Sequence, residues 1–141
     1  MNAPSDDSWT YFDHDADVGI IGRGPTVEAA LEQAARATFA IMADLAAVRP
    51  VRSVEVSFEE SDPDLALVTW LNGLIAQARI ERLALGRFHL RREGDRWAGS
   101  AEGEPWRDDL ERGVEVKGAT LTMLSVRRDD GGWEARCVVD V

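Results

Sequence analysis

The spacing of apolar residues along the chain predicts two helices. Positions 27, 31, 34, 38, 41 and 45 recur every three or four residues and form one face of an amphipathic helix. Thr26 precedes this helix as its N-cap, and Pro50 follows its end. A second helix is expected to start after the N-cap residue Asp62, with Pro63 in its first position, and to run to about Leu83. Its core stripe consists of Leu67, Leu71, Leu74 and Ala78.

The remaining chain alternates between apolar and polar residues, a pattern typical of half-buried strands. Strands are expected over residues 18–22, 51–59, 86–92, 96–102, 114–128 and 133–141, with turns at 93–95 and 129–132. Gly118 predicts an irregularity in the strand 114–128. The order of elements predicts an α+β fold with two amphipathic helices packed on a mainly antiparallel sheet. We expect residues 1–8 to form a flexible tail and residues 9–141 to form a single domain.

The charge balance narrows the choice of partners. The chain has 141 residues, of which 26 are acidic and 16 basic, and its net charge is −10. Nucleic acids attract proteins mainly through basic residues, so direct nucleic-acid binding is disfavoured, whereas a divalent cation or a basic protein surface is favoured. No apolar stretch is long enough to cross a bilayer, and the N-terminus lacks the apolar run of a signal peptide. We therefore expect a cytoplasmic protein with no membrane partner.

The first candidate site is the acidic segment that precedes the strand 18–22. Asp13, Asp15 and Asp17 are spaced two residues apart, so their carboxylates share one side of an extended chain. Several oxygen ligands close together suit a hard cation such as Ca²⁺. The segment is not an EF-hand, because Val18 and Gly24 stand where that loop has glycine and glutamate. The alternative is an acidic loop that faces solvent before a strand.

The second candidate site is the end of the chain. The alternating pattern continues to Val141, whereas a terminal strand usually leaves frayed residues beyond it. The Asp140 carboxylate, the Val141 carbonyl and the terminal carboxylate are then concentrated in an ordered region, which also suits a hard cation. The alternative is a strand that ends there without binding anything.

Two further patterns are less specific. Residues 22–26 read Gly-Arg-Gly-Pro-Thr before a helix, but they lack the third glycine and the Gly-Lys-Ser/Thr of phosphate-binding loops, so a strand-to-helix turn is expected. Glu115 and Lys117 share one face of the expected strand 114–128. They form either a surface ion pair or a lysine presented to a partner or an anion.

Support for a catalytic role is weak. Cys137 is on the apolar face of the last expected strand and is predicted to be a buried structural thiol. The chain has only two histidines, His14 and His89, which disfavours a histidine-rich metal centre. Nucleophilic catalysis therefore has little support, whereas hydrolysis by a pair of carboxylates stays open in so acidic a chain, although no spacing singles out a pair.

Five segments, in the same order along the chain, resemble one known protein family. They are Tyr-Phe-Asp-His-Asp-Ala-Asp-Val-Gly at 11–19, Phe-Ala-Ile-Met-Ala-Asp at 39–44, Val-Thr-Trp-Leu-Asn-Gly-Leu-Ile at 68–75, Glu-Val-Lys-Gly-Ala-Thr at 115–120 and Val-Val-Asp-Val at 138–141. These segments are similar to the motifs of the archease family, and the resemblance covers residues 9–141. The chain departs from the family pattern at Leu121 and Thr122, where members often have Tyr-His, and at Asp15, where they often have threonine.

The resemblance implies a small α+β protein that acts as a non-catalytic cofactor of the tRNA-splicing RNA ligase. That ligase joins 3′-phosphate or cyclic-phosphate ends to 5′-hydroxyl ends with GTP and Mn²⁺, and archeases promote its guanylylation and turnover. The family's metal site corresponds to Asp17, Asp140 and Val141, with Ca²⁺ as the expected ion. Contacts with the ligase are expected at Lys117, Asp15 and Asp44. The alternatives are a chaperone or specificity modulator of another tRNA-modifying enzyme, or a small metal-dependent hydrolase.

Overall fold

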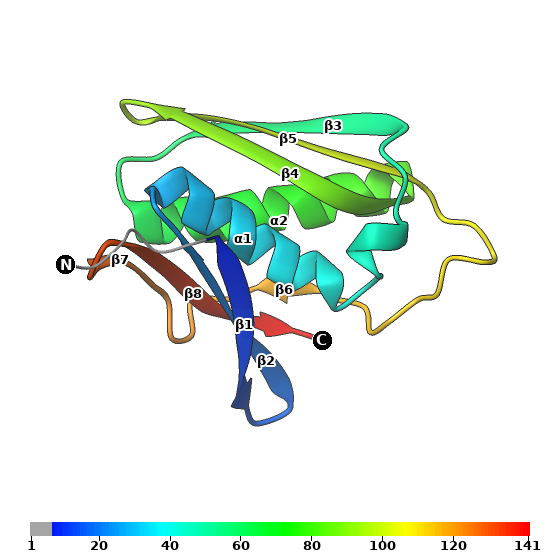
Figure 1. The fold of residues 1–141 in the computed structure, drawn as a ribbon, viewed down its shortest axis with the longest axis horizontal. Helices are drawn as coiled ribbons and strands as arrows, with labels where there is room; N and C mark the ends of the chain where they lie inside the picture. Colours follow the sequence, from blue (N-terminus) through cyan, green and yellow to red (C-terminus); the bar gives the residue numbers. More distant parts are fainter. Residues whose placement is uncertain (1–6) are drawn as a thin grey trace.

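In the computed structural model, which describes residues 7–141, two helices lie between two antiparallel sheets (Figure 1). The five-stranded sheet contains β1 (Ser8–His14), β2 (Asp17–Gly24), β8 (Gly132–Asp140) and β6 (Gly118–Ala119) in that order, and β7 (Ser125–Asp129) also pairs with β8. The three-stranded sheet contains β3 (Arg52–Glu59), β5 (Arg96–Pro105) and β4 (Leu83–Glu93). The helices are α1 (Val27–Ala40) and α2 (Pro63–Glu81), and a short 3₁₀ helix, η1, spans Leu45–Ala47. The α+β class with two helices packed on antiparallel strands is confirmed, and the strands form two sheets.

The starts of both helices are as predicted. The Thr26 hydroxyl accepts a hydrogen bond from the Ala29 amide at 3.1 Å, and the Asp62 carboxylate accepts one from the Asp64 amide at 2.9 Å. The expected extension of α1 to residue 45 is wrong, because the chain leaves the helix after Ala40 and forms η1. No helix within residues 7–141 combines the length and the apolar character that a bilayer span requires.

Two expectations about strands are also wrong. No strand was predicted over β1, because it is an exposed edge strand and its own sequence shows little alternation of apolar and polar residues. Its pairing with β2 defines it. The expected strand 114–128 is mostly irregular. The amide of Val114 donates to the Ile41 carbonyl instead of to a sheet, and Met123 has a left-handed backbone conformation with φ 56°. Only β6 and β7 remain of it.

Close packing between layers explains the glycine-rich turn before α1. A methyl group at Gly22 would overlap backbone atoms of Ala30 and Ala34 in α1. The glycine therefore allows β2 and α1 to approach each other, and residues 22–26 lead from the end of β2 into α1 as the expected strand-to-helix connection. Cys137 is fully buried on the same side of the sheet, as predicted, and burial raises the pKa of its thiol to about 12.

A buried carboxylate joins two loops to the end of β5. Glu104 is 1% exposed, and its oxygens accept hydrogen bonds from the Arg49 side chain at 2.8 and 3.0 Å, from the Arg49 amide at 2.7 Å and from the Arg107 side chain at 2.9 Å. These donors stabilise the charged form and lower the pKa of Glu104 to about 2. This cluster fixes the segments that precede β3 and follow β5.

We expect Glu104→Gln to lower the melting temperature by several degrees at neutral pH. Glu104 is ionised in the folded chain down to about pH 2, whereas an ordinary glutamate is protonated below about pH 4.5. Its stabilising contribution is therefore complete above pH 4.5 and is lost as the pH falls towards 2. Thermal melts of both proteins between pH 2 and 7 measure this difference. Glu59→Gln, at an exposed ion pair with Arg96, is the control, and an equal effect there would contradict the prediction.

Candidate functional site

The register of the five-stranded sheet brings the two predicted metal-site aspartates to the same end of neighbouring strands. Val18 of β2 is opposite Val139 of β8, so Asp17 and Asp140 are the next residues along this antiparallel pair. His14 of β1 is in turn opposite Asp17. Directly opposed residues in an antiparallel sheet point to the same face. The three side chains therefore form one row across β1, β2 and β8.

This row is on the face of the sheet that points away from the helices. Ile20 and Val139, which alternate with the row residues along β2 and β8, are in the core. Asp140 is exposed and Asp17 is half-buried. Val141 directly follows Asp140, where the C-terminus lies beyond β8 (Figure 1). The three residues predicted to bind a metal are thus at one accessible end of the sheet.

The donor atoms at this end fit a hard cation. Two aspartate carboxylates and the oxygens of Val141 are the oxygen ligands that Ca²⁺ prefers. The Nδ1 atom of His14 is buried and has no hydrogen-bond partner, so a polar group is available beside the aspartates. Within the described part of the chain, no three His, Cys, Asp or Glu side chains gather closely enough to hold a metal. A cation here would therefore depend on Val141 or on a partner for further ligands.

The main chain of Lys117 lies beside the Asp140 end of this row. Lys117 is the only lysine among the 16 basic residues, and it is exposed. Its amide donates to the Asp140 carbonyl at 2.8 Å, and Gly118 pairs with Asp140 in the sheet. The expected strand that would pair Lys117 with Glu115 is wrong, because residues 113–117 are irregular and Glu115 pairs with Arg79 at 3.8 Å. Among residues 7–141 no ion pair involves Lys117, which leaves its ammonium available.

Asn72 is a positioning residue that the sequence motif contains but the spacing did not single out. Its side chain accepts a hydrogen bond from the Ala119 amide at 2.8 Å and donates one to the Ala119 carbonyl at 3.2 Å. These two bonds join α2 to the two-residue strand β6, directly after Lys117. A lone polar residue on a helix gives no local sign of such a contact, so only the motif pointed to it.

Removing the Asn72 side chain should loosen β6. We expect Asn72→Ala to lower the free energy of unfolding by about 1–2 kcal/mol, because the amide and the carbonyl of Ala119 would each lose a hydrogen bond. Hydrogen exchange checks the site of the effect, and the Ala119 amide should lose protection while amides in β4 keep theirs. A uniform loss of protection across the chain would show instead that Asn72 supports the whole fold.

Asp15 and Asp44, the other two residues expected to contact a partner, lie in different parts of the structure. Asp15 is in the β1–β2 turn, exposed and in a left-handed conformation with φ 51°, two residues before Asp17. Asp44 is exposed between α1 and β3, and its carboxylate accepts a hydrogen bond from the Ala46 amide at 3.1 Å as the cap of η1. Asp15 therefore lies in the same β1–β2 hairpin as Asp17, whereas Asp44 is on a separate segment.

Comparison with known proteins gives the family. The model of the archease protein family matches residues 9–141. The chain belongs to the archease family. A protein archease from Methanopyrus kandleri is 33% identical over 138 residues, which cover 94% of this chain and 99% of that protein. Another archease, from Aeropyrum pernix, is 32% identical and covers 94% of this chain and 96% of its own length.

Solved structures agree with the archease fold. The solution structure of Methanobacterium thermoautotrophicum protein 1598 has a TM-score of 0.79 and 27% sequence identity, and the match covers 95% of this chain and 99% of that one. A crystal structure from Thermotoga maritima, described as an archease and possible chaperone, has a TM-score of 0.66 and 20% identity and covers all of this chain. The layers, strand order and helix positions described above are therefore those of an archease.

Proposed function

We propose that this chain is a non-catalytic, metal-binding protein cofactor of an RNA ligase that uses GTP and Mn²⁺. In this role it promotes guanylylation of the ligase and its turnover in tRNA splicing or RNA repair. The observation that carries the proposal is the convergence of Asp17, Asp140 and Lys117 at one end of the five-stranded sheet. Membership of the archease family supports it, because these residues belong to the motifs that resemble the family's.

The metal in this proposal is a divalent cation, most simply Ca²⁺. Asp17, Asp140 and the oxygens of Val141 would hold it, and it would supply a fixed positive charge among the carboxylates. The half-buried position of Asp17 limits its access to water. His14 would help to orient the ligands of the ion by a hydrogen bond from its Nδ1 atom, which is buried and has no partner among the described residues.

Charge complementarity supports a protein partner that is basic. The net charge of −10 disfavours contact with an RNA backbone and favours a cationic pocket on another protein. Asp15 and Asp17 on the β1–β2 hairpin, with Asp140 beside them, would face such a pocket. Lys117 would then contact an acidic residue or a phosphate within the predominantly basic site of the partner.

The decisive experiment measures guanylylation of purified ligase with GTP and Mn²⁺, with and without this protein. The proposed function predicts faster guanylylation and repeated turnover of the ligase in its presence. No change in either quantity would reject the ligase assignment. A protein that hydrolyses phosphoesters without ligase would instead be a metal-dependent hydrolase.

A second candidate function is that of a chaperone or specificity modulator of a tRNA-modifying enzyme. The observation that favours it is the description of the Thermotoga maritima archease as a possible chaperone. The two functions differ in a simple readout. A chaperone would raise the yield or change the site preference of the modifying enzyme and leave the guanylylation rate of the ligase unchanged.

The Lys117 ammonium gives a direct test of partner contact. We expect Lys117→Ala to reduce activation of the ligase by about tenfold, because a charged contact at the interface is lost. Its melting temperature should not change, since Lys117 is exposed and has no ion pair among the described residues. Lys117→Arg is the control and should keep part of the activation. Full activation by Lys117→Ala would remove this residue from the interface.

A further inference from the structure

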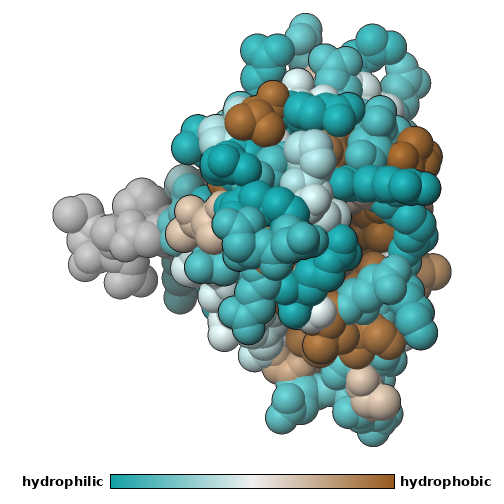
Figure 2. All heavy atoms as spheres, turned by 90° about the vertical axis from the view of Figure 1, so that its right-hand side faces the viewer, coloured by the Kyte–Doolittle hydropathy of each residue, from teal (hydrophilic) through white to brown (hydrophobic). Residues whose placement is uncertain are grey.

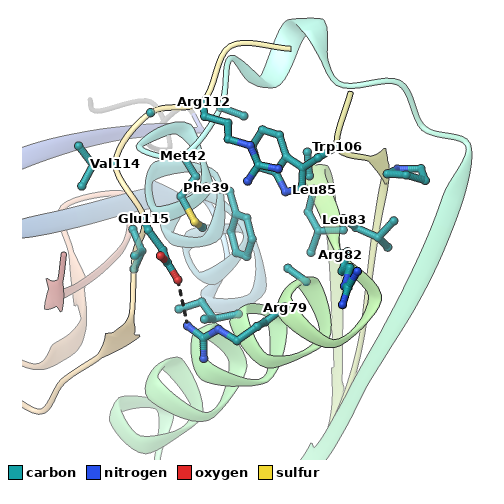
Figure 3. A pocket seen from close by; sticks show the side chains of 17 residues that line it. Phe39, Met42, Arg79, Arg82, Leu83, Leu85, Trp106, Arg112, Val114 and Glu115 are labelled. Atoms are coloured by element: carbon teal, nitrogen blue, oxygen red, sulfur yellow. Dashed lines mark ion pairs between the residues drawn. The ribbon is translucent and has the colours of Figure 1, made fainter. Parts of the chain in front are cut away.

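A second accessible feature is a pocket of about 690 Å³ between the C-terminal ends of the two helices. Phe39, Met42, Ile75, Leu83 and Leu85 form its apolar floor. This floor belongs to α1, α2 and β4 and their ends, so regular secondary structure preforms it. Figure 3 shows the lining side chains around an open centre. The end of the molecule in Figure 2 is otherwise mostly hydrophilic, with separate hydrophobic patches.

The rim of the pocket has the opposite charge to the chain as a whole. Arg79, Arg82 and Arg112 line it together with a single acid, Glu115. Within residues 7–141, neither Arg82 nor Arg112 has a carboxylate within ion-pair distance, although the chain has 26 acidic residues. Arg79 has only the long pair with Glu115, and both of these side chains are more than half exposed. The rim is therefore a local cationic region with free guanidinium groups.

Two details distinguish Arg82 and Arg112 among the side chains of the rim. Arg82 ends α2 in a left-handed conformation, with φ 57° and ψ 47°, where helices usually place glycine. An arginine here costs stability that glycine would not, and such strain is characteristic of functional positions. The Arg112 guanidinium lies 4.1 Å from the centre of the Trp106 ring, which holds its plane in place at the rim.

We propose that this pocket binds a segment of the partner protein in which a large apolar side chain is flanked by carboxylates. The apolar side chain would occupy the floor, and the carboxylates would pair with Arg82 and Arg112, whose planar groups suit them. An open pocket fits a segment of a larger chain better than a small molecule, which a binding site usually encloses. This inference rests on the proposed role of the protein as a partner-binding cofactor.

The pocket also adjoins the residue that would contact the ligase. Val114, Glu115 and Val116 form one wall of it, and Lys117 is the next residue. Val114 is 57% exposed at the pocket and would be covered by a bound segment. A single partner would therefore contact both the cationic pocket and the row that contains Asp17 and Asp140, because the two lie at the same end of the sheet.

Peptide titration followed by NMR tests the proposal. The probe is a blocked hexapeptide, Asp-Glu-Leu-Phe-Glu-Asp, and amide shifts are expected at Met42 and at residues 112–116. A matched peptide with lysine in place of each acid should bind at least about fivefold more weakly. Absence of shifts at these residues with millimolar acidic peptide, or equal binding of the lysine peptide, would overturn the proposal. If 2-naphthoate bound as tightly as the peptide, the pocket would be reassigned to a small ligand.

Variants separate a binding role from a structural one. Arg82→Gly should raise the melting temperature, because glycine adopts the left-handed conformation without strain, and should weaken peptide binding by about fivefold. Arg91→Ala, on the exposed face of β4, is a charge control and should leave peptide binding unchanged. Unchanged peptide binding by Arg82→Gly would contradict the assignment.

The ligase assay distinguishes failure of this inference from failure of the proposed function. If wild-type protein activates the ligase and Arg82→Gly with Arg112→Ala activates it at the same protein concentrations, the pocket is not the partner site but the function stands. If the acidic peptide binds at the pocket and no activation occurs with wild-type protein, the ligase assignment fails and the pocket has another protein partner.

Discussion

Replacing both aspartates of the row, as Asp17→Asn with Asp140→Asn, is expected to weaken Ca²⁺ binding by about a hundredfold and to remove most activation of the ligase. Each substitution keeps the size of the side chain and removes one anionic ligand. The affinity of a hard cation depends on the number of charged ligands, and about tenfold for each carboxylate corresponds to roughly 1.4 kcal/mol. Calorimetry with Ca²⁺ measures the first effect, and the guanylylation rate measures the second.

The matched control is Asp108→Asn with Asp129→Asn. These acids are exposed, Asp108 after β5 and Asp129 at the end of β7, and the control makes the same change in net charge. It should bind Ca²⁺ within about twofold of the wild type, since long-range charge effects are screened by salt. Equal Ca²⁺ affinity in the wild type and the Asp17–Asp140 variant would reject the metal site. Normal Ca²⁺ binding with lost activation would instead assign the aspartates to the partner contact.

Replacing Trp70 with alanine is expected to cost about 3–5 kcal/mol of folding free energy, which is a large part of the stability of a domain of this size. The Trp70 side chain is fully buried, and its indole nitrogen donates to the Leu31 carbonyl at 3.0 Å. The ring lies on Gly99 of β5, where an added methyl group would overlap it. Trp70 thus joins α2 both to α1 and to the three-stranded sheet, and its loss leaves a cavity between these layers.

Urea unfolding followed by circular dichroism measures this cost. Trp70→Phe retains most of the ring and loses the hydrogen bond, so its effect should be well under half as large. Trp106→Ala, at the half-buried tryptophan of the pocket, is a second control with a smaller expected loss. A Trp70→Ala protein as stable as the wild type would mean that the two helices and the three-stranded sheet do not depend on this contact.

Local patterns in the sequence were sufficient for the presence and the starts of both helices, for two hairpins and for the fold class. The capping side chains of Thr26 and Asp62 act within three residues, and the apolar faces of both helices repeat along the sequence itself. The turns at 93–95 and 129–132 connect strands that are adjacent in the chain, and both hairpins form as predicted. Where an element depends on its own neighbours in sequence, spacing alone indicates it.

The edge strand β1, the second sheet and the irregular segment 113–117 depend on distant partners. The strand β1 is defined by its pairing with β2 rather than by its own exposed residues. The division into two sheets follows from the pairing of β3 with β5, which are separated in the sequence by α2 and β4. Segment 113–117 is bound to the two residues that follow α1, because the amides of Gly113 and Val114 donate to carbonyls there, although its alternation is typical of a strand. The periodicity of a sequence indicates which side of a helix or strand is apolar, but it does not indicate which other element that side packs against.

The candidate site divides in the same way. The sequence by itself determined the family motifs, the acidic character of the chain and the oxygen-rich segments around Asp17 and Asp140. Only the tertiary structure brought Asp17, Asp140 and Lys117 together, because their proximity results from the register of β2 with β8 and of β8 with β6. It alone showed the Asn72 bonds to β6 and the cationic pocket. These features join segments tens of residues apart through hydrogen bonds and packing that no local spacing records.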